Sequence, residues 1–317
     1  MTPLDLLAAC IVDAVIGDPP AWPHPVRWMG RLITRVEKWT RRFCVGSVSL
    51  RVTGIALALG LPSLAFCAGW VAIATGAAIH DWIGRGIGIW LASTVLAWRD
   101  LVDHVGAVSH ALQTGTLDGG RRSVSLIVGR DTDRLSEPEI VRATVETIAE
   151  SASDGIIAPV FFLVLGGPPL ALAYKAVSTL DSMIGHRDAA YEDFGWASAK
   201  LDDVVNWIPA RLTGWLIALA AGAVCWNTRS VHRSGALLLR DGHKHPSPNS
   251  GRPEAAMAGA LGVQLGGTNF YAGLRHDRPL LGDPQEPLRA AHITRAQHIM
   301  TVAYLIAIAA CLGFLWH

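Results

Sequence analysis

Charged residues are scarce in this chain. Asp, Glu, Lys and Arg make up 17% of its 317 residues, whereas hydrophobic residues make up 51%. A soluble globular protein ordinarily carries about a quarter charged residues. The formal net charge is only +1. This excludes a nucleic-acid-binding protein that relies on a strongly basic surface to bind phosphates. With a mean hydropathy of +0.33, the composition indicates an integral membrane protein with membrane lipid, and no nucleic acid, among its partners.

Several motifs that carry chemistry are also absent. No two cysteines have the CxxC spacing of a zinc or redox site, and their places within mostly apolar runs predict small buried side chains: Cys10, Cys44, Cys67, Cys225 and Cys311. The sequence lacks a Walker A motif, a kinase glycine-rich loop and a GxGxxG fingerprint, so any nucleotide site is not of a common type. Residues 1–17 lack the basic start and cleavage site of a signal peptide, and we interpret them as a retained first helix.

Long apolar runs are what the sequence has instead. A helix needs about 20 apolar residues to cross the hydrocarbon core, and three segments reach this length: 53–79, 207–226 and 299–316. Segments 4–17 and 84–98 are short for a crossing unless they tilt or are anchored by interfacial tryptophans. The sequence therefore predicts an all-α, multi-pass transmembrane protein that forms a single integral membrane domain over residues 1–317.

Glycine and proline interrupt two further apolar stretches. The run Gly166, Gly167, Pro168 and Pro169 divides 155–177 into halves of about ten residues, which predicts either a re-entrant hairpin or a broken helix. Such backbone is tolerated at membrane depth only when protein shields it or when it lines a cavity. The stretch 255–265 has a similar half length and is followed by two glycines.

A basic linker between the first two spans indicates the orientation of the chain. Its cations are Arg27, Arg31, Arg35, Lys38, Arg41, Arg42 and Arg51. Because cytoplasmic loops are enriched in Lys and Arg, we expect this linker and the polar segment 99–154 to face the cytoplasm. If 155–177 is re-entrant, segment 175–206 returns to the same face. The number of crossings after Trp226 stays open.

The clearest local pattern is a capping box formed by Ser136 and Glu139, with Pro138 just inside the helix start. It predicts polar helices on the cytoplasmic side, beginning with an amphipathic helix that runs towards residue 154.

Three carboxylates, Glu146, Glu150 and Asp154, follow on this helix at intervals of four. Residues four apart drift by only about 40° around an α-helix, so the three form one acidic ridge. The plain alternative is a solvated helix face. However, no Lys or Arg lies between Arg142 and Lys175, and uncompensated carboxylates at a membrane boundary are costly. This favours a site for a hard cation that bridges substrate phosphates.

Further polar residues gather in four shorter segments. One follows the interrupted stretch and comprises Lys175, Asp181, Ser182, Asp202, Asp203, Asn206 and Arg211. Its aspartates could complete a metal site, while its cations could neutralise phosphate oxygens or merely snorkel from membrane ends. Two loops suited to anions hold Arg130 with Asp131, and His245 with Asn249 and Glu254. A proline-rich connector holds Asp18, His24 and Arg27, for which turn and capping roles are the alternative.

Six stretches in this order resemble the adenosylcobinamide-phosphate synthase family of cobalamin biosynthesis: 17–31, 128–132, 145–162, 174–185, 201–212 and 245–262. Two positions depart from the family pattern, since Ser151 and Ser178 stand where the family often has Asn. The resemblance implies an inner-membrane enzyme that uses ATP and Mg²⁺, and the orientation inferred from the basic linker places its active site on the cytoplasmic face. It implies an amide bond between adenosylcobyric acid, a corrinoid, and aminopropanol phosphate; threonine phosphate stays open as the amine.

For the reaction that the resemblance implies, the chemistry of the residues singled out above predicts their roles. The expected Mg²⁺ ligands are Glu146, Glu150, Asp154, Asp202 and Asp203. The expected catalytic residues are Glu150, Asp154, Lys175, Asp181 and His245, with the choice of general base between His245 and a carboxylate left open. The expected ATP- and substrate-binding residues are His24, Arg27, Arg130, Asp131, Ser182, Asn206, Arg211, Asn249 and Glu254. A further expected partner is the next membrane-bound enzyme of the pathway.

A membrane transporter of a corrinoid or a related solute is the main alternative, because broken helices and intramembrane carboxylates such as Asp13 are also transporter features. Against it, most charged residues lie in polar stretches between spans, and the two halves of the sequence show no similarity.

Overall fold

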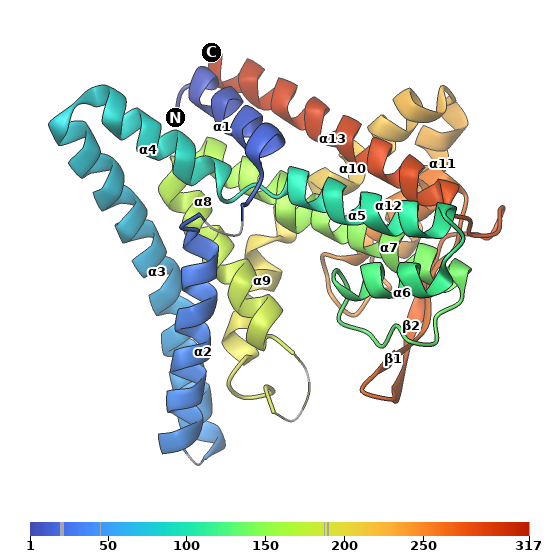
Figure 1. Cartoon of the computed structure of the whole chain (residues 1–317), viewed down its shortest axis with the longest axis horizontal. Coiled ribbons are helices and arrows are strands. Elements are labelled where there is room, and N and C mark those ends of the chain that lie inside the picture. Colours follow the sequence, from blue (N-terminus) through green and yellow to red (C-terminus); the bar gives the residue numbers. More distant parts are fainter. Residues whose placement is uncertain (20–21, 45, 187, 189, 317) are drawn as a thin grey trace. The chain divides into compact units, whose positions relative to one another are not determined.

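The computed structural model describes residues 1–19, 22–44, 46–186, 188 and 190–316, so Pro20 of the connector lies outside the described residues. Contacts within the chain group it into two compact units (Figure 1). The first comprises residues 1–97, 158–206 and the segment from Cys311 onwards, and the second comprises Trp98–Ile157 and Trp207–Ala310. The expected all-α membrane class is confirmed, with one β-hairpin added to it.

The first unit is built from helices. They are α1 (Pro3–Ile16), α2 (Pro25–Phe43), α3 (Ser47–Ile79), α4 (Asp81–Ser93), α8 (Ala158–Ile184) and α9 (Trp196–Val205). The second unit contains α5 (Trp98–Gln113), α6 (Leu117–Ser125), α7 (Glu137–Ser151), the π-helix η1 (Ala152–Ile157), α10 (Trp207–Cys225), α11 (Thr228–Asp241), α12 (Gly251–Leu261), β1 (Leu265–Tyr271), β2 (Leu274–Leu281) and most of α13 (Ala291–Trp316).

Four helical stretches of the described chain are long and apolar enough to cross a membrane: α3, the run Glu137–Ile184, α10 and α13. Helices α3 and α13 contain the predicted spans 53–79 and 299–316, and α10 covers 207–226 except for Trp226, which confirms the three spans by length and composition. Helices α1 and α4 have 14 and 13 residues, so each rises by only about 20 Å against a hydrocarbon core of about 30 Å. They pack against each other within the first unit, where Arg85 donates to Asp5 at 3.1 Å.

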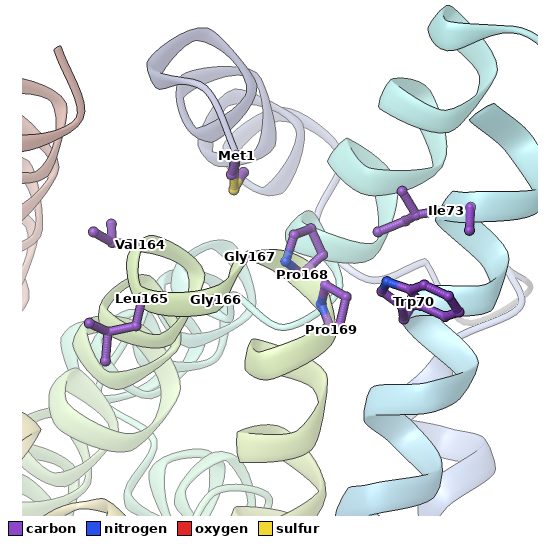
Figure 2. A pocket seen from close by; sticks show the side chains of 10 residues that line it. Met1, Trp70, Ile73, Val164, Leu165, Gly166, Gly167, Pro168 and Pro169 are labelled. Carbon is purple, nitrogen blue, oxygen red and sulfur yellow. The ribbon is translucent and has the colours of Figure 1, made fainter.

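The glycine-proline interruption breaks α8. Gly166 (φ −149°, ψ 17°) and Gly167 (φ 69°, ψ −168°) leave the helical region, and only glycine adopts a positive φ readily. A pocket of about 390 Å³ opens at this break, lined also by Met1 and by Trp70 and Ile73 of α3 (Figure 2). The predicted interruption of 155–177 is confirmed, and its irregular backbone lines a pocket as expected.

Helix α7 begins where the sequence predicts. The Glu139 carboxylate accepts hydrogen bonds from the Ser136 backbone N–H (2.8 Å) and hydroxyl (2.6 Å), and Pro138 occupies the first turn. The α-helix ends at Ser151, however, and η1 follows. The ridge of three carboxylates was predicted on one continuous α-helix. Because a π-helix bonds i to i+5, Asp154 no longer follows the α-helical spacing of Glu146 and Glu150, and that part of the prediction is wrong.

The stretch 255–265 is not one apolar segment. Helix α12 ends at Leu261 because Gly262 takes the left-handed conformation (φ 73°) that terminates helices. An antiparallel hairpin of β1 and β2 then follows, with Thr268 opposite Asp277 and a bulge between Leu265 and Gly267. The run of β-formers from Thr268 to Tyr271, followed by a glycine-containing turn, is the signal from which this hairpin was predictable.

Candidate functional site

Polar side chains from four segments of the second unit converge beside α7. They come from α7 itself, from the loop that precedes it, from the first turn of α12 and the loop before it, and from the hairpin; Figure 1 labels α7, α12, β1 and β2. The residues are Arg130, Arg142, Glu146, Glu150, His245, Ser250, Glu254, Asn269, Tyr271 and Arg278. Their contacts divide into two layers. The inner layer surrounds Glu146, and the outer layer surrounds Glu254.

A buried ion pair forms the centre of the inner layer. Arg130 Nη2 lies 2.5 Å from Glu146 Oε2, and the two side chains are only 6% and 4% exposed. The other oxygen of Glu146 accepts the backbone N–H of Gly266 at 2.8 Å, and Arg130 also donates to Asn269 Oδ1 at 2.8 Å. Glu146 was expected to be an uncompensated metal ligand. Instead, an arginine from the preceding loop neutralises it, so the premise that the ridge lacks compensation is wrong.

The remaining inner contacts fasten the hairpin to α7. Buried Arg142 donates to the carbonyl oxygens of Gly266 and of Thr268, the latter at 2.8 Å. The carboxylate of Asp131 accepts the backbone N–H groups of Ala272 (3.0 Å) and Gly273 (2.7 Å) at the hairpin turn. Asp131, expected to bind substrate, therefore holds the turn of the hairpin.

The outer layer centres on Glu254 in the first turn of α12. This side chain is buried, with the residue 2% exposed, and among the described residues its Oε1 has no hydrogen-bond partner. His245 Nε2 lies 4.0 Å from that oxygen. Burial and the charges of Glu146 and Glu150 raise the pKa of Glu254 well above its ordinary value, although Arg278 and Arg130 act in the opposite direction. The site thus holds a carboxyl group that is poised to exchange a proton.

The tautomer of His245 follows from its backbone contact. The N–H of Ser247 donates to His245 Nδ1 at 3.0 Å, so the neutral ring carries its proton on Nε2, the nitrogen that faces Glu254. In this state His245 presents a donor to the site and no accepting lone pair.

Arg278 of β2 closes the outer layer. Its Nη2 donates to the Tyr271 hydroxyl at 3.2 Å, and its Nη1 lies 3.4 Å from His245 Nε2. On the α7 side, the exposed carboxylate of Glu150 accepts the Ser250 hydroxyl at 3.1 Å. The sequence interpretation missed Arg278, Tyr271 and Ser250. Ser250 lies in a stretch that carries the family resemblance, but a single strand arginine gives no signal without its hairpin.

The rest of the second-unit predictions have simpler surroundings. Arg211 folds back on the first turn of α10, where it donates to the Trp207 carbonyl (2.7 Å) and its guanidinium lies 3.9 Å from the Trp207 ring centroid. Asn249 is buried beside the site, and its N–H donates to Ser247 Oγ at 3.3 Å. Asp154 is half-buried in η1.

The other expected site residues lie in the first unit. Tyr174 donates to Asn206 Oδ1, and Asn206 Nδ2 donates to Asp202 Oδ1, both at 2.9 Å. Ser182 donates to the Ser178 carbonyl. Asp203 lies 3.9 Å from Lys200, and Lys175 and Asp181 lie on α8.

The connector before α2 uses its polar residues internally. Arg27 donates to the carbonyls of Asp18 (2.9 Å) and Pro19 (3.0 Å), and His24 Nε2 lies 2.8 Å from Asp18 Oδ1. These contacts favour the turn alternative for His24 and Asp18, although the His24 side chain makes no capping hydrogen bond at the start of α2.

The described residues contain no group of three or more His, Cys, Asp or Glu side chains that could hold a metal ion by themselves. The five residues expected to be metal ligands therefore do not form such a group within either unit.

Comparisons with known proteins give one consistent family. The family model described as CobD/Cbib protein matches residues 6–300. Cobalamin biosynthesis protein CobD of Klebsiella pneumoniae is 45% identical over 99% of this chain and 97% of its own length. CobD of Photorhabdus laumondii is 43% identical over 97% and 96%, and CbiB of Salmonella typhi is 45% identical over 98% and 96%. No solved structure matches this chain.

Proposed function

This chain belongs to the CobD/CbiB protein family, and on that premise we propose that it acts in cobalamin biosynthesis as an ATP-dependent amide synthase. It joins adenosylcobyric acid to aminopropanol phosphate and gives adenosylcobinamide phosphate. The enzyme sits in the inner membrane with the site of the second unit facing the cytoplasm. The observation that carries the proposal is Glu254, a buried carboxyl group whose Oε1 accepts no hydrogen bond from the described residues, beside His245 and Arg278.

The reaction sets the requirements for the site. A carboxylate is unreactive towards an amine because its oxygen is a poor leaving group, so ATP first transfers its γ-phosphoryl group to give an acyl phosphate and ADP. The amine, which arrives as an ammonium ion, loses a proton and attacks the acyl carbon. Inorganic phosphate then leaves, and a second proton leaves the nitrogen. The protein must position the partners, stabilise phosphate charge and accept protons.

Glu254 fits the role of general base better than His245. Its raised pKa brings proton exchange closer to neutral pH, and Oε1 is the accepting atom. The Ser247 contact of His245 occupies Nδ1 and leaves an N–H directed at the carboxylate. We assign His245 the task of orienting Glu254 and of donating a hydrogen bond.

The donor set also fits magnesium carried in by ATP. Protein sites usually supply Mg²⁺ with one or two carboxylates and leave the other positions to phosphates and water. The exposed Glu150 carboxylate, whose hydrogen bond comes from a neutral hydroxyl, suits this role, with Asp154 in the following π-helix as the second ligand. When bound, Mg²⁺ would neutralise charge on the ATP phosphates. Glu146 is committed to Arg130 and Gly266 and is not assigned to the metal.

The test uses purified, detergent-solubilised protein with adenosylcobyric acid, aminopropanol phosphate, ATP and Mg²⁺, and detects the amide by mass spectrometry. We expect product only when all four components are present. Glu254→Gln should abolish product while the protein stays folded, whereas Glu137→Gln, an exposed carboxylate at the start of α7, should not affect it. Absence of product from folded wild-type protein would overturn the proposal.

A further inference from the structure

Arg278 lacks the carboxylate partner that several other arginines of the second unit have, and it donates to no backbone carbonyl of the described residues. Arg130 has Glu146 at 2.5 Å, Arg240 has Asp241 at 2.7 Å, and Arg275 has Asp277 at 3.0 Å. No carboxylate oxygen of the described residues lies within 4.0 Å of the Arg278 guanidinium, although the residue is half-buried. Glu254, Glu150 and Glu146 act on its charge only from beyond ion-pair distance, so the guanidinium can still bind an anion that arrives with a ligand.

The neighbours of Arg278 complete a site for an anion. Two neutral groups touch the guanidinium, the Tyr271 hydroxyl at 3.2 Å and the His245 ring at 3.4 Å. In the tautomer fixed by Ser247, His245 contributes an N–H. A guanidinium, a phenol and an imidazole N–H together offer several hydrogen-bond donors to the oxygens of a phosphate group. Hydrogen bonds between a guanidinium and a phosphate are charge-assisted and are stronger than those between neutral groups.

The position of Arg278 and Tyr271 indicates which anion they bind. His245 Nε2 lies 3.4 Å from Arg278 and 4.0 Å from Glu254, so this anion site is separated from the proposed base by one side chain. The ammonium group of the amine substrate must reach Glu254, and its phosphate ester is only two carbons away from that nitrogen. Resting on the function proposed above, we infer that Arg278, supported by Tyr271, binds the phosphate of the amine substrate and selects phosphorylated over unphosphorylated amino alcohols.

The test distinguishes binding of the amine substrate's phosphate by Arg278 from binding of ATP by the same residue. In Arg278→Ala, KM for aminopropanol phosphate should rise about 10- to 100-fold, in keeping with the loss of one hydrogen-bonded charge partner. The KM for ATP should stay within about twofold of wild type, and kcat/KM should fall much more for aminopropanol phosphate than for unphosphorylated aminopropanol. Arg275→Ala, in the same strand but exposed and paired with Asp277, is the matched control, and Arg278→Lys should recover part of the loss. Thermal unfolding of each variant checks the fold.

A second measurement does not need turnover. Calorimetric titration of aminopropanol phosphate into the full chain, without ATP, should show binding to wild type and to Arg275→Ala, and at least tenfold weaker binding to Arg278→Ala. An unchanged KM or binding constant, an equal loss for both amines, a rise in the KM for ATP instead, or wild-type protein that binds no phosphorylated amine would each overturn the inference. Binding that depends on Arg278 without any amide product would refute only the proposed reaction.

Discussion

Substituting Arg130 by alanine tests whether Glu146 belongs to the framework of the site. The variant leaves a 4% exposed carboxylate with the Gly266 N–H but without its guanidinium partner. Removing one partner of a buried ion pair costs about 3–5 kcal/mol, because the remaining charge stays desolvated. For proteins of 150–250 residues, each kcal/mol shifts the Tm by roughly 2–4 °C, so we expect a fall of about 6–20 °C in detergent.

The assay combines thermal unfolding with amide hydrogen exchange. Exchange should quicken most in β1, because Arg130 also holds Asn269. The control Arg275→Ala removes an exposed pair and should leave the Tm near that of wild type. The double variant Arg130→Met with Glu146→Leu should recover part of the stability, since it leaves no buried charge. If Arg130→Ala unfolds within about 3 °C of wild type yet loses activity, Arg130 is a ligand-binding residue and Glu146 becomes available to a metal again.

Three further outcomes are expected. Glu254→Gln removes a carboxyl group whose pKa lies above the ordinary 4.5. The stability contributed by the neutral carboxyl is complete below pH 4.5 and is lost as the pH rises through the raised pKa. The wild-type Tm should therefore fall relative to that of the variant over this pH window, and parallel Tm curves would contradict the assignment. Asp131→Ala removes the acceptor of two turn N–H groups, and hydrogen exchange at Ala272 and Gly273 should quicken without a change at α12. Gly266→Ala places a methyl group against the Pro279 carbonyl at φ 81° and should destabilise the protein by at least about 1–3 kcal/mol, whereas Gly129→Ala, with open space around its Cβ and an ordinary φ, should leave the Tm near that of wild type.

Features that depend on a short stretch of the sequence were predictable. Apolar run length located three spans, the Ser136 capping box located the start of α7, and the run of glycine and proline located the break in α8. Each depends on interactions between residues close together in the chain, such as backbone conformation and capping.

Features that depend on distant partners were not predictable in the same way. The acidic ridge was interpreted by counting cations along its own helix, but the cation that neutralises Glu146 comes from the preceding loop, and the N–H that binds it comes from position 266. Arg278 becomes part of the site only when the hairpin returns β2 to α12. The family resemblance pointed to the right stretches, but it could not separate residues that hold the site together from residues that face a ligand.

The two Leu-Gly-Gly triplets illustrate the same limit. Both put their second glycine at positive φ, 69° for Gly167 and 91° for Gly267. The first triplet, residues 165–167, breaks a helix and lines a pocket. The second, residues 265–267, forms a bulge in β1, and Arg142 donates to the backbone of that strand. The shared conformation follows from glycine, while the different outcomes follow from what surrounds each triplet.

The fastening of the hairpin to α7 has a consequence for selectivity by size. Arg130, Arg142 and Asp131 hold β1 at several points along its length, and β2 packs against α12. The guanidinium of Arg278 and the carboxylate of Glu254 are therefore carried on elements that both pack against α7 or against each other. Under the function proposed above, their spacing favours one length of substrate, and we predict that an amino alcohol phosphate with a longer carbon chain reacts more slowly.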